Sequence, residues 1–77
     1  MCGLAGMLVN RNISNEQNLI NLKKMTNALE HRGPDNLQTY IDDYVGLGHT
    51  RLSIIDLSNS ANQPMFSFSK RYMIIFN

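Results

Sequence analysis

Apolar and polar residues alternate along the chain in patterns that predict one helix and several strands. A short apolar run, residues 3–9, ends at the polar residues 10–12, and its length favours a buried strand over a helix. Gly3 and Gly6 lower the strand propensity of this run. If the run is a strand, another group must therefore approach its backbone closely.

A helix is predicted to begin after Ser14 and to continue to about Glu30. Ser14 is placed as an N-cap, with Gln17 completing a capping box and Ile13 as a hydrophobic staple. One face of the helix is predicted to be core, because its apolar residues recur at helical spacing: Leu19, Ile20, Leu22, Met25, Ala28 and Leu29.

The segment 31–35, His-Arg-Gly-Pro-Asp, should end this helix. Pro34 disfavours helical geometry in the residue before it, and Gly33 can supply a positive φ at that point.

Two strands are predicted next, at 37–41 and 45–52, joined by a hairpin-like turn at 42–44. The Ser- and Asn-rich stretch 56–64 is interpreted as loop. A strongly apolar strand at 72–76 is predicted to be buried, and it would need cover on both faces. Because termini usually fray in solvent, we expect the chain to be cut from something longer.

Composition and net charge limit which classes of protein this chain can belong to. The 77 residues form one domain at most, and the formal net charge of +1 argues against binding to nucleic acid or to an anionic membrane. One cysteine excludes an internal disulfide, and no Cys/His cluster has the spacing of a metal site. No membrane-spanning run or secretory signal is recognised, so a soluble, cytoplasmic chain is expected.

Cys2 is the strongest candidate for chemistry. A lone cysteine is usually a small buried hydrophobe, but removal of Met1 would give this one a free α-amine. Such an amine has a pKa near ~8, close to the ~8.5 of a thiol, so it can accept the thiol proton and later return it to a leaving group. Cys2 could then serve as nucleophile and base in one residue.

Arg51 has two interpretations. It could be an exposed arginine at the end of a strand, or a fork that binds a substrate carboxylate through two hydrogen bonds. His31 and His49 are expected to be hydrogen-bonded structural histidines, since two histidines with no acidic third ligand make a poor metal site.

Five motifs in order resemble one family, the glutaminase domain of glutamine-hydrolysing asparagine synthetases, which are class II (N-terminal nucleophile) glutamine amidotransferases. The motifs are Met-Cys-Gly-Leu-Ala-Gly at 1–6, His-Arg-Gly-Pro-Asp at 31–35, His-Thr-Arg-Leu-Ser-Ile-Ile-Asp-Leu at 49–57, Gln-Pro-Met at 63–65 and Ile-Phe-Asn at 75–77. The resemblance covers the whole chain, residues 1–77.

The resemblance implies a role for particular residues. Cys2 would attack the side-chain amide of glutamine, release ammonia and form a glutamyl thioester that water hydrolyses. Asn77 would donate its side-chain amide to the oxyanion. The α-carboxylate of glutamine would be held by Arg51, in a pocket lined by the backbone of Leu52, Ser53, Ile54 and Ile55.

The resemblance also implies an α+β fold, part of a four-layer α/β/β/α sandwich with two antiparallel sheets. The family's oxyanion glycine and the two acidic residues that grip the substrate amine follow the position of Asn77, so residues 1–77 alone are expected to be inactive. No cofactor is expected in this segment. ATP and Mg²⁺ would belong to a C-terminal synthetase domain, which is expected to be the partner of this one.

Several alternatives remain open from the sequence. The parent enzyme could form a homodimer, and its acceptor could be aspartate or a sugar of surface-polysaccharide synthesis. A different class of function is a non-catalytic short protein that folds against a partner, which would explain the apolar strand at 72–76.

Overall fold

The computed structural model describes residues 2–52 and 62–77, which form one helix, one short 3₁₀ turn and five strands. In chain order these are β1 (Gly3–Leu8), α1 (Asn15–Asn27), the 3₁₀ turn η1 (Glu30–Arg32), β2 (Asn36–Ile41), β3 (Val45–Arg51), β4 (Met65–Phe66) and β5 (Met73–Ile74).

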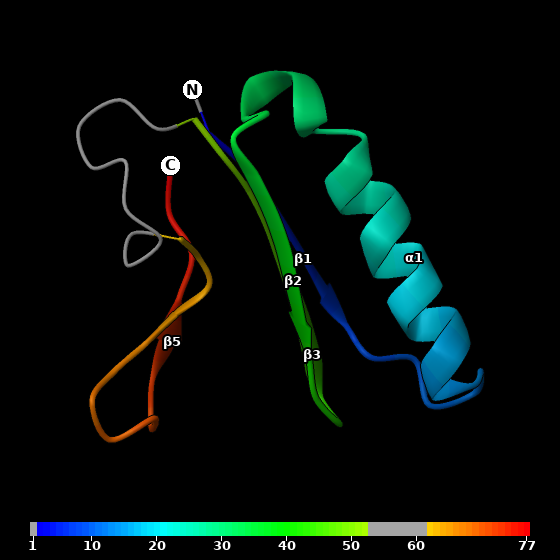
Figure 1. Cartoon of the computed structure of the whole chain (residues 1–77). Coiled ribbons are helices and arrows are strands. Elements are labelled where there is room, and N and C mark those ends of the chain that lie inside the picture. The colour runs from blue at the N-terminus through cyan, green and yellow to red at the C-terminus, as the bar shows by residue number, and fades with distance from the viewer. Residues whose placement is uncertain (1, 53–61) are drawn as a thin grey trace.

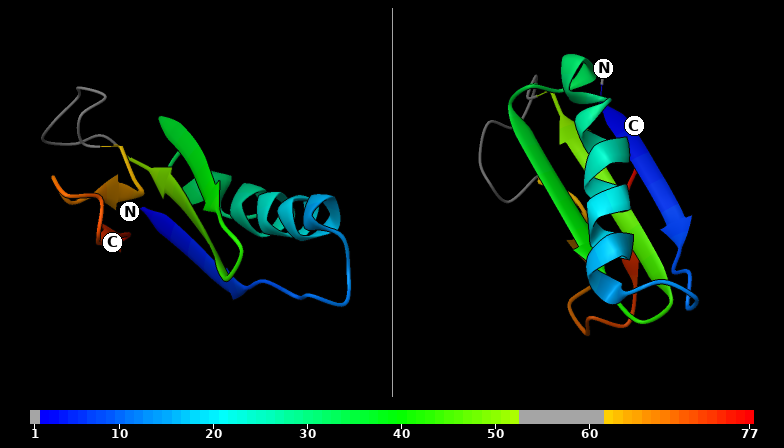
Figure 2. Two further views of the ribbon diagram at one scale, coloured as in Figure 1. Left: turned by 90° about the horizontal axis from the view of Figure 1, so that it is seen from below. Right: turned by 90° about the vertical axis from the view of Figure 1, so that its right-hand side faces the viewer.

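The described elements form three layers (Figure 1). An antiparallel sheet in the order β1-β3-β2 carries α1 on one face, and the antiparallel hairpin β4-β5 lies on its other face. Figure 2 shows α1 lying along the strands in front of the sheet, with the hairpin behind. The mixed α+β class expected from the sequence is therefore confirmed for these residues.

Small residues on β3 let the helix approach the sheet. A Cβ atom built at Gly48 would meet the Oγ1 atom of Thr26, and one at Gly46 would lie 3.0 Å from Cδ2 of Leu22. Both partners are helix residues with no exposed surface. The two glycines that weaken β3 as a strand are therefore the contact surface for α1.

The start of α1 confirms the predicted cap. The Ser14 Oγ atom accepts a hydrogen bond from the Gln17 backbone N–H at 3.0 Å. In a full capping box the Gln17 side chain would also bond the backbone N–H of Ser14. Here the Gln17 side chain donates to Asn21 Oδ1 instead. Ile13, predicted as a staple, is 37% exposed.

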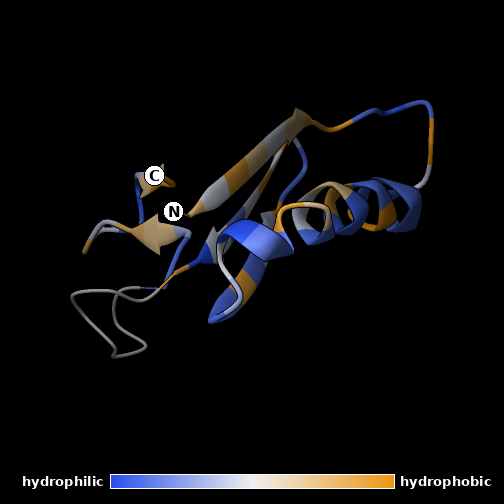
Figure 3. Cartoon of the chain, turned by 90° about the horizontal axis from the view of Figure 1, so that it is seen from above, coloured by the Kyte–Doolittle hydropathy of each residue, from blue (hydrophilic) through white to orange (hydrophobic). Residues whose placement is uncertain are grey.

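The predicted core face of the helix is partly wrong. Ile20 and Met25 are each 40% exposed, whereas Asn18 and Thr26 are fully buried beside Leu22. Burial of these two polar residues is possible because their side chains are satisfied locally: Asn18 bonds the backbone of the preceding loop, and Thr26 donates to the Leu22 carbonyl at 2.8 Å. Figure 3 shows that polar residues dominate α1, whereas apolar residues run along β1.

The segment after the helix also differs from the prediction. α1 ends at Asn27 rather than near Glu30, and η1 follows. Gly33 has a φ of −154°, so it supplies no positive φ. Its lack of a side chain is needed for a different reason, because a Cβ atom there would collide with the backbone of Thr50 and Arg51.

The hairpin β2-β3 confirms the predicted strands and turn. Asp42 Oδ1 accepts hydrogen bonds from the backbone N–H groups of Tyr44 and Val45, each at 2.8 Å. These bonds stabilise the charged carboxylate and lower the pKa of Asp42 below its ordinary value.

The prediction of a buried strand at 72–76 is wrong in its burial. Only Met73–Ile74 is strand, and Tyr72, Ile74 and Phe76 are 65%, 53% and 49% exposed. The β5 strand pairs with β4, which was not predicted, and the hairpin touches the larger sheet through an edge-to-face contact of Tyr40 with Phe66. Of the predicted loop at 56–64, only residues 62–64 lie within the described chain, and they carry no strand or helix.

Candidate active site

Cys2 lies directly before β1 and is held at the end of the larger sheet. Its thiol is free and half-buried, and the Sγ atom accepts the backbone N–H of Leu52 at 3.4 Å. The next residue is anchored as well, because the Gly3 N–H donates to Thr50 Oγ1 at 3.1 Å and that hydroxyl donates to the Leu29 carbonyl. The backbone next to the thiol is thus tied to both β3 and the turn between α1 and η1.

A cavity of about 320 Å³ lies beside the thiol. It is lined by Cys2, Gly3, Leu4, Leu29, Arg32 and Asn77. This volume is at the lower end of the ~300–1,000 Å³ typical of small-molecule sites. The fold therefore brings Cys2 and Asn77 to one cavity although they lie at opposite ends of the sequence, and the two marked ends lie close together in Figure 1.

Arg32 is a cavity residue that the sequence reasoning did not assign. It belongs to the His-Arg-Gly-Pro-Asp motif at 31–35, so the signal was present as part of the resemblance. Arg32 carries a positive charge, and such a residue in the cavity wall suits an anionic ligand or a developing negative charge.

Arg51 is not the exposed arginine of the simpler interpretation, because only 6% of it is exposed. Its Nη1 group donates to Asn62 Oδ1 at 2.7 Å. The register of β1 against β3 ends at the pair Gly3 and Thr50, so one further step places Cys2 opposite Arg51. Arg51 is not among the residues that line the cavity beside Cys2.

The two faces of β3 contact different layers. Gly48 and Thr50 face the helical layer, where they meet Thr26 and Leu29. Side chains alternate along a strand, so His49 and Arg51 face the β4-β5 layer. Of the predicted pocket residues, Leu52 is half-buried, whereas Ser53, Ile54 and Ile55 lie outside the described residues.

His49 is fully buried and hydrogen-bonded, as expected for a structural histidine. Its Nε2 atom lies 3.1 Å from the Phe76 carbonyl, which can only accept, so this nitrogen carries the proton. Burial lowers the pKa of His49, against the opposing effect of the Phe76 bond, and the nearby Arg51 guanidinium lowers the pKa further. Nδ1 is buried and makes no hydrogen bond in the structure.

Gln63 is a second residue that the sequence reasoning left without a role. It is 5% exposed, and its Oε1 atom accepts the Phe76 N–H at 2.7 Å. It is part of the Gln-Pro-Met motif at 63–65, which carried the resemblance without an assigned role.

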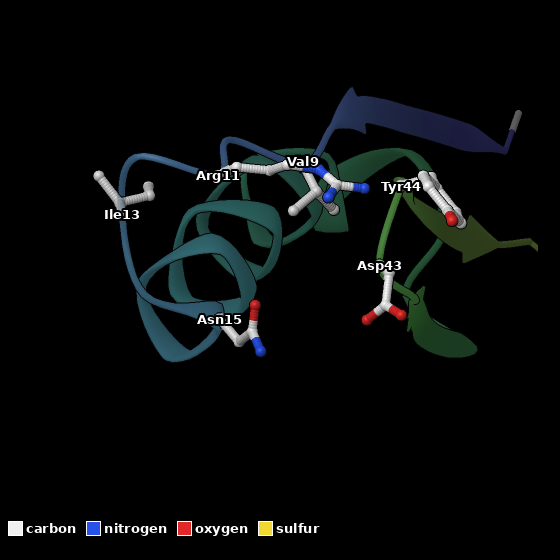
Figure 4. Close-up of a pocket in the computed structure, with 6 residues that line it drawn as sticks. All are labelled: Val9, Arg11, Ile13, Asn15, Asp43 and Tyr44. Atoms are coloured by element: carbon white, nitrogen blue, oxygen red, sulfur yellow. The ribbon is translucent and has the colours of Figure 1, made fainter.

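A second cavity lies at the other end of β1, between the loop that enters α1 and the β2-β3 turn (Figure 4). The Arg11 guanidinium stacks over the Tyr44 ring there, 5.2 Å from its centroid, with Asp43 and Asn15 also lining the space. Among residues 2–52 and 62–77, no three His, Cys, Asp or Glu side chains are grouped as metal ligands, and no helix is long and apolar enough to cross a membrane.

Comparison with known proteins decides the family. Residues 1–77 match the glutamine amidotransferase domain over their full length. The chain belongs to the glutamine amidotransferase family. This membership agrees with the resemblance seen in the five sequence motifs.

Curated relatives of this amidotransferase domain include two asparagine synthetases (glutamine-hydrolysing) of Bacillus subtilis. Number 1 is 39% identical over 80 residues, covering all of the chain and 12% of the relative, and number 2 is 40% identical over 78 residues, covering all of the chain and 10% of the relative. Amidase chyE of Penicillium rubens is 45% identical over 74 residues, covering 83% of the chain and 11% of the relative. The chain thus spans about an eighth or less of the length of these relatives. No solved structure matches it significantly.

Proposed function

We propose that this chain is the glutaminase part of a glutamine-dependent asparagine synthetase, with Cys2 as its nucleophile. After removal of Met1, the α-amine of Cys2 takes the thiol proton, and Sγ attacks the side-chain carbonyl of glutamine. Collapse of the tetrahedral intermediate breaks the C–N bond, the proton goes to the departing ammonia, and a glutamyl thioester remains. Water then hydrolyses the thioester to glutamate and restores the thiol.

The observation that carries this proposal is the meeting of Cys2 and Asn77 in one cavity. A thiol nucleophile needs a hydrogen-bond donor close to the oxygen that becomes negative during attack. The side-chain amide of Asn77 is such a donor, and the resemblance assigns it this role. Family membership and the cavity geometry therefore support the same pair of residues.

Arg51 is proposed to bind the α-carboxylate of glutamine, with Leu52 to Ile55 lining the pocket. Its guanidinium is buried next to the peptide that contacts Cys2, and arginine binds carboxylates through paired hydrogen bonds. The guanidinium is also oriented by Asn62, so its direction is defined before substrate arrives.

The wider assembly is proposed from the same relationship. The described layers would be three of the four in an α/β/β/α sandwich. Ammonia would pass to a C-terminal synthetase domain, which would use ATP and Mg²⁺ to amidate aspartate in the cytoplasm, with a homodimer as the quaternary state.

One observation favours a second acceptor for the released ammonia. The chain matches proteins named asparagine synthetases and proteins named amidases at similar identity, 39% and 45%. The glutaminase residues are therefore compatible with more than one downstream reaction.

Ammonia release from glutamine by the protein as its host produces it tests the proposal. Cys2→Ala should abolish this release, while synthesis supplied with free ammonia should continue. Retention of Met1 should have the same effect as Cys2→Ala, because the α-amine would no longer be available as a base.

Two results would contradict the assignment. Equal loss of the glutamine-dependent and ammonia-dependent activities in Cys2→Ala would show that Cys2 is not the glutaminase nucleophile. No ammonia release by the wild-type protein would leave the non-catalytic alternative, in which these residues fold against a partner.

A further inference from the structure

The peptide backbone of Phe76 is held at both its polar groups by buried side chains from two other segments. Its N–H donates to Gln63 Oε1 at 2.7 Å, and its carbonyl accepts from His49 Nε2 at 3.1 Å. His49 comes from β3 and Gln63 from the segment before β4, and both are at most 5% exposed. Neither residue has a role in the function proposed above.

We propose that His49 and Gln63 are positioning residues that aim the Asn77 side chain at the reaction centre. This inference rests on the proposed function, in which Asn77 is the oxyanion donor. The Phe76 carbonyl belongs to the same planar peptide group as the Asn77 nitrogen. His49 holds this group, and Gln63 holds the preceding peptide group, which carries the Phe76 N–H. Holding both groups fixes the position of the Asn77 Cα atom, from which the side chain leaves the backbone.

Within the described residues, burial does not hold Asn77 in place. Phe76 is 49% exposed and Asn77 is exposed as well, so the surroundings of their side chains do not define their orientation. The strand pairing of β5 also stops at Ile74, before either residue. The two part-buried hydrogen bonds to the Phe76 N–H and carbonyl supply the restraint that sheet pairing does not.

The same short segment also orients Arg51. Asn62, next to Gln63, accepts from Arg51 Nη1 at 2.7 Å. Residues 62–63 thus link the group proposed to bind the carboxylate and the group proposed to stabilise the oxyanion. The two neighbouring side chains should nevertheless affect different kinetic parameters, which makes the inference testable.

Gln63→Met is the decisive variant, because it keeps the length of the side chain and removes the acceptor for the Phe76 N–H. An oxyanion donor acts in the transition state and not in ground-state binding, so we expect kcat for glutamine hydrolysis to fall about 10- to 100-fold. The KM for glutamine should change by less than about 2-fold. Gln63→Glu keeps an acceptor oxygen and should recover most of kcat.

Gln17→Met is the matched control, since it makes the same substitution at an exposed glutamine of α1 and should leave both parameters unchanged. Backbone hydrogen exchange over residues 72–77 gives an independent readout. Exchange should accelerate in Gln63→Met and stay as in the wild type in Gln17→Met.

A double-mutant cycle separates this inference from the proposed function. In an Asn77→Ala background, Gln63→Met should cause no further loss of kcat, because it acts through Asn77. A full additional loss in that background, a rise in KM alone, or unchanged exchange over 72–77 would overturn the positioning role. If Asn77→Ala itself leaves kcat unchanged, the oxyanion assignment fails and this inference falls with it.

Discussion

At position 48 the sheet has no room for a methyl group. A Cβ atom there would collide with Thr26 on the facing helix, and Thr26 is fully buried. Overpacking of this kind typically costs about 1–3 kcal/mol. We therefore expect Gly48→Ala to lower the free energy of unfolding by that amount, measured by urea denaturation.

The control at this position is a compensating change on the helix. Thr26→Ala removes the Oγ1 and Cγ2 atoms nearest the new methyl group, so the double variant Gly48→Ala/Thr26→Ala should be more stable than the sum of the single effects predicts. Strict additivity would show that the cost arises elsewhere, for example from strand propensity.

Individual residues also show where sequence reasoning stops. Glycines in a strand indicate a close approach, but the pattern does not say which element approaches. Gly33 was expected to bend the backbone, and the structure uses it to avoid the backbone of Thr50. Spacing alone favoured an exposed Arg51, because local spacing does not reveal the hydrogen bond to Asn62, 11 residues further along the chain.

At the scale of the elements, the entry to α1 depends on two side chains. Ser14 caps the helix from an exposed position, whereas Asn18 is buried and bonds to the backbone N–H and carbonyl of Asn10 as well as to the Ser14 carbonyl. Ser14→Ala should cost about 1 kcal/mol. Asn18→Ala should cost more, about 1–3 kcal/mol, because it leaves loop groups without partners.

Urea denaturation of both variants checks this order. Asn27→Ala, at an exposed position of the same helix, is the control and should change the stability by less than about 0.5 kcal/mol. A larger loss for Ser14→Ala than for Asn18→Ala would show that the cap, and not the buried amide, organises this loop.

The elements that local patterns determine were predicted well. β1, the start of α1 and the β2-β3 hairpin follow from apolar spacing, a cap and a turn, all of which act between near neighbours in the sequence. The burial of 72–76 was wrong because it depends on what packs against the strand, and apolar composition alone does not contain that information. The same reason explains the exposure of Ile20 and Met25.

At the scale of the whole molecule, His49 links β3 to the segment after β5 and should make stability depend on pH. The folded-state pKa of His49 lies below the ordinary value of 6.5, so the unfolded chain takes up this proton at a higher pH than the folded chain. The contribution of His49 to stability is therefore fully present above pH ~6.5 and is lost as the pH falls from there toward the folded pKa. Arg51, which faces the same layer, adds to the penalty for protonation.

Unfolding measured at pH 7.5 and at pH 5 tests this expectation. The wild type should lose more stability between these values than His49→Gln, which keeps a donor but cannot titrate. His31→Gln, at an exposed histidine, is the matched control and should behave as the wild type does. An identical pH response of all three proteins would contradict the prediction.

The candidate site was predictable in part from single residues and in part only through its motifs. Cys2 could be proposed from its position after Met1 and from the chemistry of an α-amine. Asn77, by itself, carries no signal in the sequence, and only the resemblance pointed to it. The structure singles out three further residues through contacts across the fold, which no local pattern contains: Arg32, His49 and Gln63.

The meeting of Cys2 and Asn77 in one cavity has a consequence for biosynthesis. The ribosome adds roughly 5–20 residues per second, so the thiol of Cys2 is made about 4–15 s before the amide of Asn77. During that interval the nascent chain carries a cysteine with no formed cavity around it. Under the proposed function, glutamine hydrolysis would have to wait at least until Asn77 has been synthesised.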